Sequence, residues 1–297
     1  MDTRFQLNFI VQQDGQLLRE AISDWGISKR ALTAIKFDGG ELLVNGEERN
    51  VRHQLTKGDQ VSIIFPSEEA SEGLVAEKGP LKILYEDEAL LVIDKPPYMN
   101  TIPSREHPAG SVANFVYGYF LEQQIASTVH IVTRLDRDTS GLMCIAKHRH
   151  IHHLMSEQQK AGAVHREYEA LVHGIVRQAK QSIIAPIGRK ETSIIEREVR
   201  GDGQFAHTDV TLLKLLSEPQ PMSQIRLKLY TGRTHQIRVH MAHIGHPLVG
   251  DELYGGSREL LDRQALHCVW LQFVHPLTGE NISFSSEIPE QLTPPRN

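Results

Sequence analysis

A loop rich in charged residues carries the side chain best suited to chemistry, the carboxylate of Asp136. An apolar stretch, 130–132, precedes the sequence Thr-Arg-Leu-Asp-Arg-Asp-Thr-Ser-Gly at 133–141. Asp136 therefore lies between Arg134 and Arg137 on a loop that joins two expected strands. Positive neighbours lower the pKa of a carboxylate, which suits a nucleophile and does not suit a proton donor. A surface loop of ion pairs has the same spacing, so this loop alone does not establish a site.

Two other side chains could act with such a carboxylate. In the sequence Glu-Tyr-Glu-Ala-Leu at 167–171, strand alternation places Tyr168 on the face opposite both glutamates. It offers a ring for stacking and a hydroxyl for proton transfer, although the pattern by itself favours a core tyrosine. Arg238 falls in the first turns of a helix expected from Thr234, and a guanidinium can pair with a carboxylate through two hydrogen bonds. The alternative for Arg238 is a surface arginine that faces phosphate.

Many short strands with inserted helices must position these residues. Apolar patterns indicate strands at 83–85, 90–93, 142–146, 168–172, 210–215 and 224–230. Helical spacing indicates helices at 112–120, 151–159 and 234–243. Strands in meanders interrupted by helices predict an α+β fold with a mostly antiparallel sheet over 80–297.

A separate module is expected at residues 1–66. Helical spacing at 17–25 ends at Gly26, and Ser28 can cap a second helix that presents Lys29, Arg30 and Lys36. A hairpin with Asn45-Gly46 at its turn and a closing strand at 61–65 follow. Residues 67–79, which contain four glutamates, are interpreted as an acidic linker that few contacts cross.

Several motifs together resemble the RluA-type family of RNA pseudouridine synthases, enzymes that isomerise uridine within RNA. The loop at 133–141 is similar to the family's Arg-Leu-Asp-x-x-Thr-Ser/Thr-Gly motif. Further segments match in the family's order between about Leu81 and Pro276: 95–96, 166–174, 231–240 and 245–255. Thr133 stands where most members carry histidine. Because the family's reaction is assigned to the aspartate, we expect activity to survive this exchange.

The resemblance implies a role for each candidate residue and no cofactor. Asp136 is expected to act on a nucleotide flipped out of its helix, with Arg238 keeping it charged and Tyr168 against the uracil. The other expected roles are as follows: Arg134 fills the space left by the extruded base, Arg137 contacts phosphate, and Ile237 lines the uracil pocket.

The N-terminal module resembles, more weakly, the αL or S-four-like RNA-binding motif. Lys29, Arg30 and Lys36 are then expected to contact RNA, the alternative being a solvated basic face without a partner. The net charge of −5 argues mildly against a polyanion partner. However, residues 219–250 contain no acidic side chain and four basic ones, so a local basic face can bind RNA.

Composition predicts a cytoplasmic protein without a membrane segment. No run of 18 or more apolar residues occurs, and the N-terminus lacks a signal-peptide core. The two cysteines, Cys144 and Cys268, are expected to be buried free thiols. We further expect a monomer.

The sequence leaves three functions to compare. The first is isomerisation of uridine in RNA, with large-subunit ribosomal RNA as the first candidate substrate and transfer RNA as the second. The second is an RNA-binding or ribosome-assembly factor that has lost catalysis, against which the intact Asp136, Tyr168 and Arg238 argue. The third is a metal-dependent hydrolase built on the histidines of 148–153, but residues two apart on a helix diverge by about 200°. We therefore expect no metal.

Overall fold

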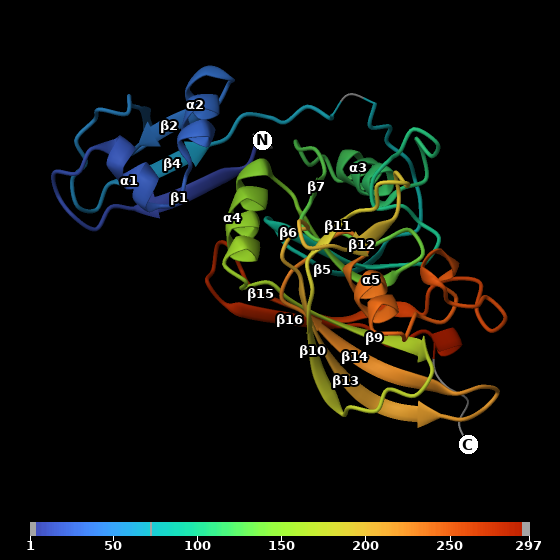
Figure 1. Cartoon of the computed structure of the whole chain (residues 1–297). Helices are drawn as coiled ribbons and strands as arrows, with labels where there is room; N and C mark the ends of the chain where they lie inside the picture. The colour runs from blue at the N-terminus through green and yellow to red at the C-terminus, as the bar shows by residue number, and fades with distance from the viewer. Residues whose placement is uncertain (1–3, 72, 293–297) are drawn as a thin grey trace.

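The first part of the chain is a small sheet packed with two short helices. The computed structural model describes residues 4–71 and 73–292. Its first sheet is antiparallel, in the order β1-β4-β2-β3 (Figure 1). The elements are β1 (Gln6–Ile10), α1 (Leu18–Asp24), α2 (Lys29–Phe37), β2 (Glu41–Val44), β3 (Glu47–Glu48) and β4 (Gln60–Ile64). The expected helices and hairpin are confirmed, whereas β1 was not anticipated.

Local chemistry explains the bounds of these elements. Gly26 has a φ of 78° just after α1, and the Ser28 hydroxyl accepts a hydrogen bond of 3.2 Å from the Ala31 N–H at the start of α2. Asn45 and Gly46 both have positive φ, as a two-residue type I′ hairpin turn requires.

The second part is built on a large mixed sheet, which confirms the α+β fold (Figure 1). Its main path runs β10-β13-β14-β9-β15-β8-β6-β5, with β16 beside β15 and β7 beside β8. The strands are β5 (Lys82–Glu86), β6 (Leu90–Lys95), β7 (His130–Ile131), β8 (Ser140–Ala146), β9 (His165–His173), β10 (Lys180–Ile184), β13 (His207–Leu216), β14 (Met222–Leu229), β15 (Leu266–Val274) and β16 (Asn281–Ser285). The remaining elements are α3 (Val112–Glu122), α4 (Arg149–Lys160), α5 (Gln236–His243), the ribbon β11 (Ile187–Arg189) and β12 (Arg197–Val199), and the 3₁₀ turns η1 (Glu252–Tyr254) and η2 (Glu290–Leu292).

Strand β15 occupies the middle of this sheet. One edge of β15 pairs antiparallel with β9, while the other edge pairs with β8 at its start and with β16 at its end. The β15–β8 pair is parallel, and the other described strand pairs are antiparallel. Because two parallel strands begin at the same edge, the loops that precede β8 and β15 meet there.

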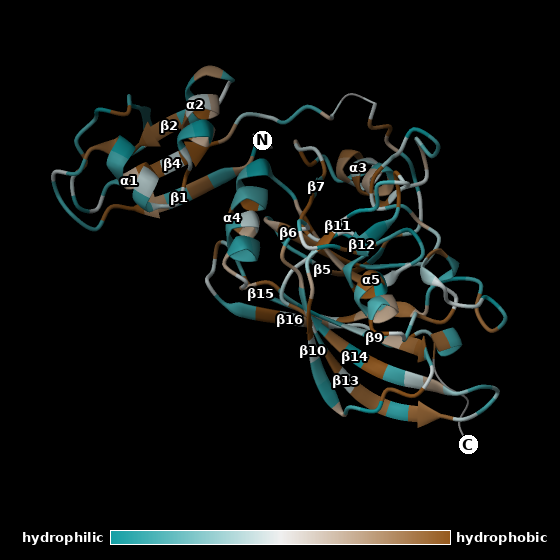
Figure 2. Cartoon of the chain, in the orientation of Figure 1, coloured by the Kyte–Doolittle hydropathy of each residue, from teal (hydrophilic) through white to brown (hydrophobic). Residues whose placement is uncertain are grey.

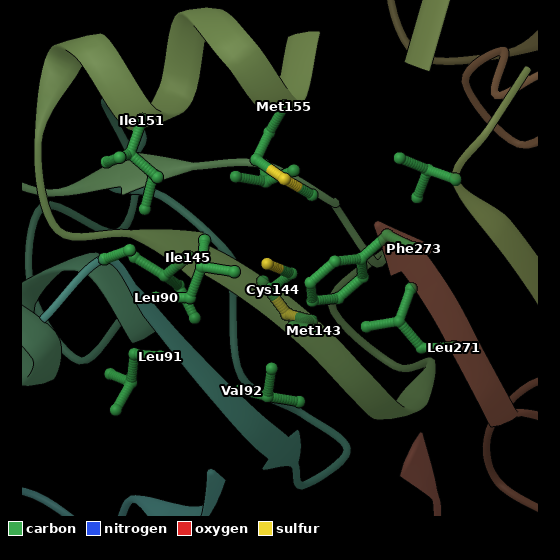
Figure 3. Close-up of a cluster of buried hydrophobic side chains, with 14 of the residues drawn as sticks. Leu90, Leu91, Val92, Met143, Cys144, Ile145, Ile151, Met155, Leu271 and Phe273 are labelled. Atoms are coloured by element: carbon green, nitrogen blue, oxygen red, sulfur yellow. The ribbon is translucent and has the colours of Figure 1, made fainter. Parts of the chain in front are cut away.

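The core lies on both faces of β8, whose seven residues are all buried. Figure 3 shows Ile151 and Met155 of α4 above this strand, with Leu91 and Val92 of the neighbouring β6 below. Both cysteines are free and buried, as expected. Farther along the sheet, Figure 2 shows hydrophobic and hydrophilic residues along β13 and β14, in keeping with one covered and one exposed face.

Two of the clustered histidines serve the junction between the small module and the large sheet. His148 stacks on Phe5 with ring centroids 4.1 Å apart, and His150 stacks on Phe65 at 5.1 Å. Burial lowers the pKa of each imidazole to about 4. Within residues 4–71 and 73–292, no three His, Cys, Asp or Glu side chains are grouped to hold a metal ion.

Residues 67–79 make contacts of their own with the catalytic part, although few contacts join that part directly to residues 4–66. The Glu68 carboxylate accepts a hydrogen bond of 2.7 Å from the Arg149 N–H at the start of α4, and its other oxygen pairs with His130. Farther on, the Val75 carbonyl accepts from the Asn114 amide at 2.8 Å, and Glu77 passes directly over α3 at Gly118. The segment has no helix or strand among its described residues, and none of these residues is buried, yet it contacts both α3 and α4. The glutamates of this segment indicated a chain surrounded by solvent. Instead, its carboxylates and carbonyls accept hydrogen bonds from a helix N–H group and from side chains.

No helix of the described residues is long and apolar enough to cross a membrane.

Candidate active site

Asp136 lies on the loop between β7 and β8, and hydrogen bonds to buried groups hold this loop in place. Thr133 at its start is buried, and its hydroxyl accepts a hydrogen bond of 2.8 Å from the Cys144 N–H. The Thr101 hydroxyl donates to the Leu135 carbonyl at 2.6 Å, and the Asp136 carbonyl accepts from the Thr139 N–H at 3.2 Å. Thr133 therefore anchors the loop through its hydroxyl.

Two buried cations support the same loop from below. The Lys95 ammonium donates to three carbonyl oxygens at 2.9 Å each, those of Pro96, Met99 and Arg137. Burial lowers the pKa of Lys95 to about 7, against the opposing effect of the nearby carboxylates. Arg263, just before β15, donates to the Asp138 carbonyl at 3.1 Å. The loop is thus attached both to the end of β6 and to the segment just before β15.

The structure brings Arg238 to Asp136, as expected. Arg238 Nη1 donates to Asp136 Oδ2 at 3.1 Å, and the guanidinium is only 7% exposed. Its Nε and Nη2 donate to the two oxygens of Asp251 at 2.7 and 2.8 Å. Burial alone would lower the pKa of Arg238, but Asp251 and then Asp136 raise it, so the guanidinium is permanently charged. The Asp136 carboxylate therefore faces a permanent positive charge.

Tyr168 and Ile237 line the cavity beside Asp136. The cavity is about 70 Å³ and lies between the loop, β9 and the start of α5. Tyr168 is buried, and burial raises the pKa of its hydroxyl well above the ordinary value. A hydroxyl that stays protonated donates a hydrogen bond and does not remove a proton. Sequence alternation correctly predicted the inward face of Tyr168, and the cavity accounts for its presence there.

A larger cleft of about 770 Å³ adjoins this cavity. Arg134 is exposed and borders both spaces, where its side chain is accessible to a ligand. Arg137 also borders the cleft, but its Nε donates to Asp138 at 2.7 Å, and that hydrogen bond raises the pKa of Arg137. To contact a phosphate, the Arg137 guanidinium must therefore either break its hydrogen bond to Asp138 or bind Asp138 and the phosphate together.

The three basic residues of the N-terminal module lie elsewhere. Lys29, Arg30 and Lys36 are exposed on α2, which Figure 1 shows well away from α5. Lys29 and Lys36 are seven positions apart and share a face, whereas Arg30 borders a cleft of about 940 Å³ between α2 and α4. The structure therefore divides the expected basic face into two adjacent parts.

Three residues of the site were missed by the sequence reasoning: His235, Asp251 and Tyr254. The last two lie in the segment 245–255, which was noted only as a motif match. Asp251 is 2% exposed, and a buried carboxylate requires a cation or several donors. The signal was an acidic residue that follows an apolar run directly, but the sequence did not show which cation it would meet.

The mostly antiparallel sheet therefore holds an aspartate against a buried arginine at the wall of a cavity. Residues 89–243 match the family model described as RNA pseudouridylate synthase. The chain belongs to this family and is an RNA pseudouridine synthase of the RluA type, an isomerase.

Its relatives support the same assignment. The chain is 51% identical over 276 residues to YjbO of Bacillus subtilis, an uncharacterized RNA pseudouridine synthase, across 93% of this chain and 96% of that protein. Ribosomal large subunit pseudouridine synthase D of Pseudomonas aeruginosa is 37% identical over 267 residues, which cover 85% of this chain and 82% of that protein. Among solved structures, human RNA Pseudouridylate Synthase Domain Containing 1 aligns with a TM-score of 0.58 at 27% identity, across 71% of this chain and 86% of that chain.

Proposed function

We propose that this enzyme converts specific uridines of large-subunit ribosomal RNA to pseudouridine, with Asp136 as the reacting carboxylate. The observation that carries the proposal is the Asp136–Arg238 pair at the wall of a cavity that also contains Tyr168. The ribosomal substrate is supported by the similarity to relatives named for the large ribosomal subunit. Transfer RNA is the second candidate substrate.

The reaction demands features that this site can supply. The uracil must detach from the ribose, rotate and reattach through C5, which requires a nucleotide extruded from its helix. We assign the larger cleft to the incoming strand and the cavity to the flipped base, with Ile237 and Tyr168 against it. Arg134 can then occupy the space that the base leaves, because a guanidinium both stacks and binds phosphate. Arg137 is assigned to a neighbouring phosphate.

The N-terminal module, residues 1–66, is assigned to RNA binding outside the catalytic cleft. The exposed Lys29, Arg30 and Lys36 on α2 support this role. Residues 67–79 connect it to the catalytic part, 80–297, and bind both α3 and α4.

Mapping pseudouridines in total RNA tests the substrate. RNA from cells with the gene, without it, and with Asp136→Asn in its place would be compared at single-nucleotide resolution. We expect one or more positions of large-subunit ribosomal RNA to lose pseudouridine in the last two strains. Loss confined to transfer RNA would establish the second substrate, and an unchanged map in both strains would favour an RNA-binding factor without catalysis.

A further inference from the structure

His235 occupies a strained position at the beginning of α5, next to the reacting carboxylate. Its backbone is left-handed, with φ 57° and ψ 19°. Residues other than glycine adopt this region rarely, and histidine is among those that do so more often. The side chain is 13% exposed and lines the cavity that contains Asp136. Backbone strain of this kind persists only where the surrounding structure holds it in place.

A chain of hydrogen bonds determines which nitrogen of His235 carries the proton. The Arg197 N–H donates to the Tyr254 hydroxyl oxygen at 2.9 Å, and that oxygen lies 2.8 Å from His235 Nδ1. Since the peptide N–H can only donate, the oxygen accepts there, and the hydroxyl hydrogen is free to point at Nδ1. Burial lowers the pKa of His235, which favours the neutral ring. A neutral ring whose Nδ1 accepts carries its proton on Nε2.

That Nε2 faces the same oxygen that Arg238 binds. His235 Nε2 lies 3.9 Å from Asp136 Oδ2, and Arg238 Nη1 lies 3.1 Å from this oxygen. The 3₁₀ turn η1 and the residue before it support both His235 and Arg238. Asp251 binds the guanidinium of Arg238, and the Tyr254 ring lies 4.9 Å from this guanidinium. Oδ2 is therefore approached by two donors, whereas Oδ1 has no hydrogen-bond partner among the described residues.

We propose that His235 is a second positioning residue, which together with Arg238 holds Oδ2 and leaves Oδ1 as the oxygen that reacts with the ribose. The 3.9 Å separation must shorten by about 0.7 Å for His235 to donate a hydrogen bond to Oδ2, a shift that a side-chain rotation can supply. Two routes are open to Oδ1: it forms a bond to C1′ of the ribose, or it takes the proton from C2′. In both routes uracil leaves with the electron pair of the glycosidic bond. The inference concerns the family's reaction at this site and holds whichever RNA is the substrate.

Nuclear magnetic resonance tests the tautomer without any substrate. Long-range ¹H–¹⁵N spectra of protein labelled with ¹⁵N-histidine distinguish the two neutral tautomers from the charged ring. The His235 signal is identified by its disappearance in His235→Asn. We expect the Nε2–H tautomer at pH 7. An Nδ1–H tautomer or an imidazolium would overturn the proposal, even if the variants proved too unstable for kinetics.

Kinetics then test the positioning role. His235→Asn is the sharper variant, because asparagine tolerates the left-handed backbone while its amide is too short to replace Nε2. The control is His243→Asn, at the exposed end of the same helix. The assay is tritium release from C5 of uridine in total RNA taken from cells lacking the gene, measured as a single turnover. At saturating enzyme we expect a loss of about tenfold or more for His235→Asn, with the half-saturating enzyme concentration within twofold and the control unchanged.

The pH profile separates positioning from a general loss of structure. Charged and titratable groups that face His235 are as follows: Asp136, Arg197, Arg238, Asp251 and Tyr254. Tyr254→Phe removes the O–H that favours the neutral ring, so the pKa of His235 rises. A charged ring beside Arg238 would make the Asp136 carboxylate a weaker nucleophile and base, so we expect the acidic limb of the rate profile to move to higher pH in this variant. A normal saturated rate for His235→Asn, or an acidic limb that Tyr254→Phe leaves in place, would refute the positioning role.

Discussion

At the scale of the residue, the site depends on one guanidinium shared between two carboxylates. Arg238 gives two of its N–H groups to Asp251 and a third to Asp136, and Asp251 is the more buried of the two. Asp251 therefore fixes the plane of the guanidinium before any substrate arrives. A planar guanidinium can satisfy this geometry. A lysine ammonium cannot, because the N–H groups of an ammonium do not lie parallel to one another.

Replacement of Arg238 tests this dependence. We expect Arg238→Lys to lower the single-turnover rate by at least about 100-fold, since one ammonium cannot bind Asp251 by two bonds and also reach Asp136. Arg238→Ala should further lower the free energy of unfolding by about 3–5 kcal/mol, because it leaves a buried carboxylate unpaired. Urea unfolding and tritium release would measure both effects. A near-normal rate for Arg238→Lys would mean that only a positive charge is needed.

Residue types and motif order predicted part of this site. Asp136, Tyr168, Arg238 and Ile237 were expected together, and the structure places them at one cavity. The supporting residues were not expected, because Asp251 is 13 positions from Arg238 and its partner follows only from the path of the chain. Sequence spacing also could not show that His235 adopts a left-handed backbone, since the surrounding contacts impose it.

At the scale of the element, α3 and the segment before β5 form one packed unit. Gly118 lies in the middle of α3, where an added Cβ would come within 2.1 Å of the Glu77 carbonyl oxygen. Neither a backbone carbonyl nor a helix can move aside cheaply. A glycine in a helix normally costs stability, so its presence here reflects this close approach.

Alanine at this position should therefore destabilise the protein. Elsewhere in a helix, Gly→Ala stabilises by about 1 kcal/mol, but we expect Gly118→Ala to cost about 2 kcal/mol or more. The control is Gly201→Ala, because nothing lies within 4 Å of its added Cβ and its φ is not positive. Urea unfolding of both variants would decide the matter, and equal stability of Gly118→Ala and wild type would show that residues 67–79 are not packed on α3.

The junction at α4 should weaken in acid. His148 and His150 have folded pKa values of about 4 against an ordinary 6.5, so the unfolded chain binds their protons first as the pH falls. The two neutral histidines contribute fully to the free energy of unfolding above pH 6.5. This contribution, about 2–3 kcal/mol for each histidine, is lost as the pH falls from 6.5 to 4. The double variant His148→Phe/His150→Phe keeps an aromatic ring at both positions without a titrating group. We expect its free energy of unfolding, measured in urea from pH 7 to pH 5, to fall less than that of wild type. If the two free energies fell in parallel with pH, these histidines would not be the origin of the acid sensitivity.

Periodicity predicted many but not all elements of the large sheet. The expected helices and the strands β5, β6, β8, β9, β13 and β14 are present within a few residues. Strands β10, β11, β12 and β16 were missed because each is short and their pairing, not their composition, defines them. β15 was missed because six of its nine residues are buried, the polar His267 among them, so its sequence shows no clear alternation of apolar and polar residues.

At the scale of the whole molecule, an acidic protein is expected to bind a polyanion through local basic surfaces. The net charge of −5 disfavours RNA at long range. The exposed arginine at the cleft and the basic residues of α2 lie on different parts of the molecule, so a long RNA substrate would contact both.

Salt dependence would measure the contribution of α2. We expect replacement of Lys29, Arg30 and Lys36 by glutamine to weaken binding of total RNA and to lower the slope of log affinity against log salt by up to about 2. The saturated single-turnover rate should be unchanged. A charge-matched control replaces three exposed cations outside α2: Lys78 of the connecting segment, and Arg177 and Lys214 of the catalytic part. The same slope in wild type and in the α2 variant would remove this helix from the RNA interface.

The central place of β15 has a consequence for when the enzyme becomes active. Without β15, the strand that carries Tyr168 and the strand that follows Asp136 belong to two unconnected half-sheets, β10-β13-β14-β9 and β8-β6-β5. Pairing between residues about a hundred positions apart forms late, because the intervening loop must be closed first. Until then each half exposes a strand edge that can pair with another chain. A growing polypeptide therefore has no complete active site until residue 274 has emerged from the ribosome, and we expect it to be most prone to aggregation before that point.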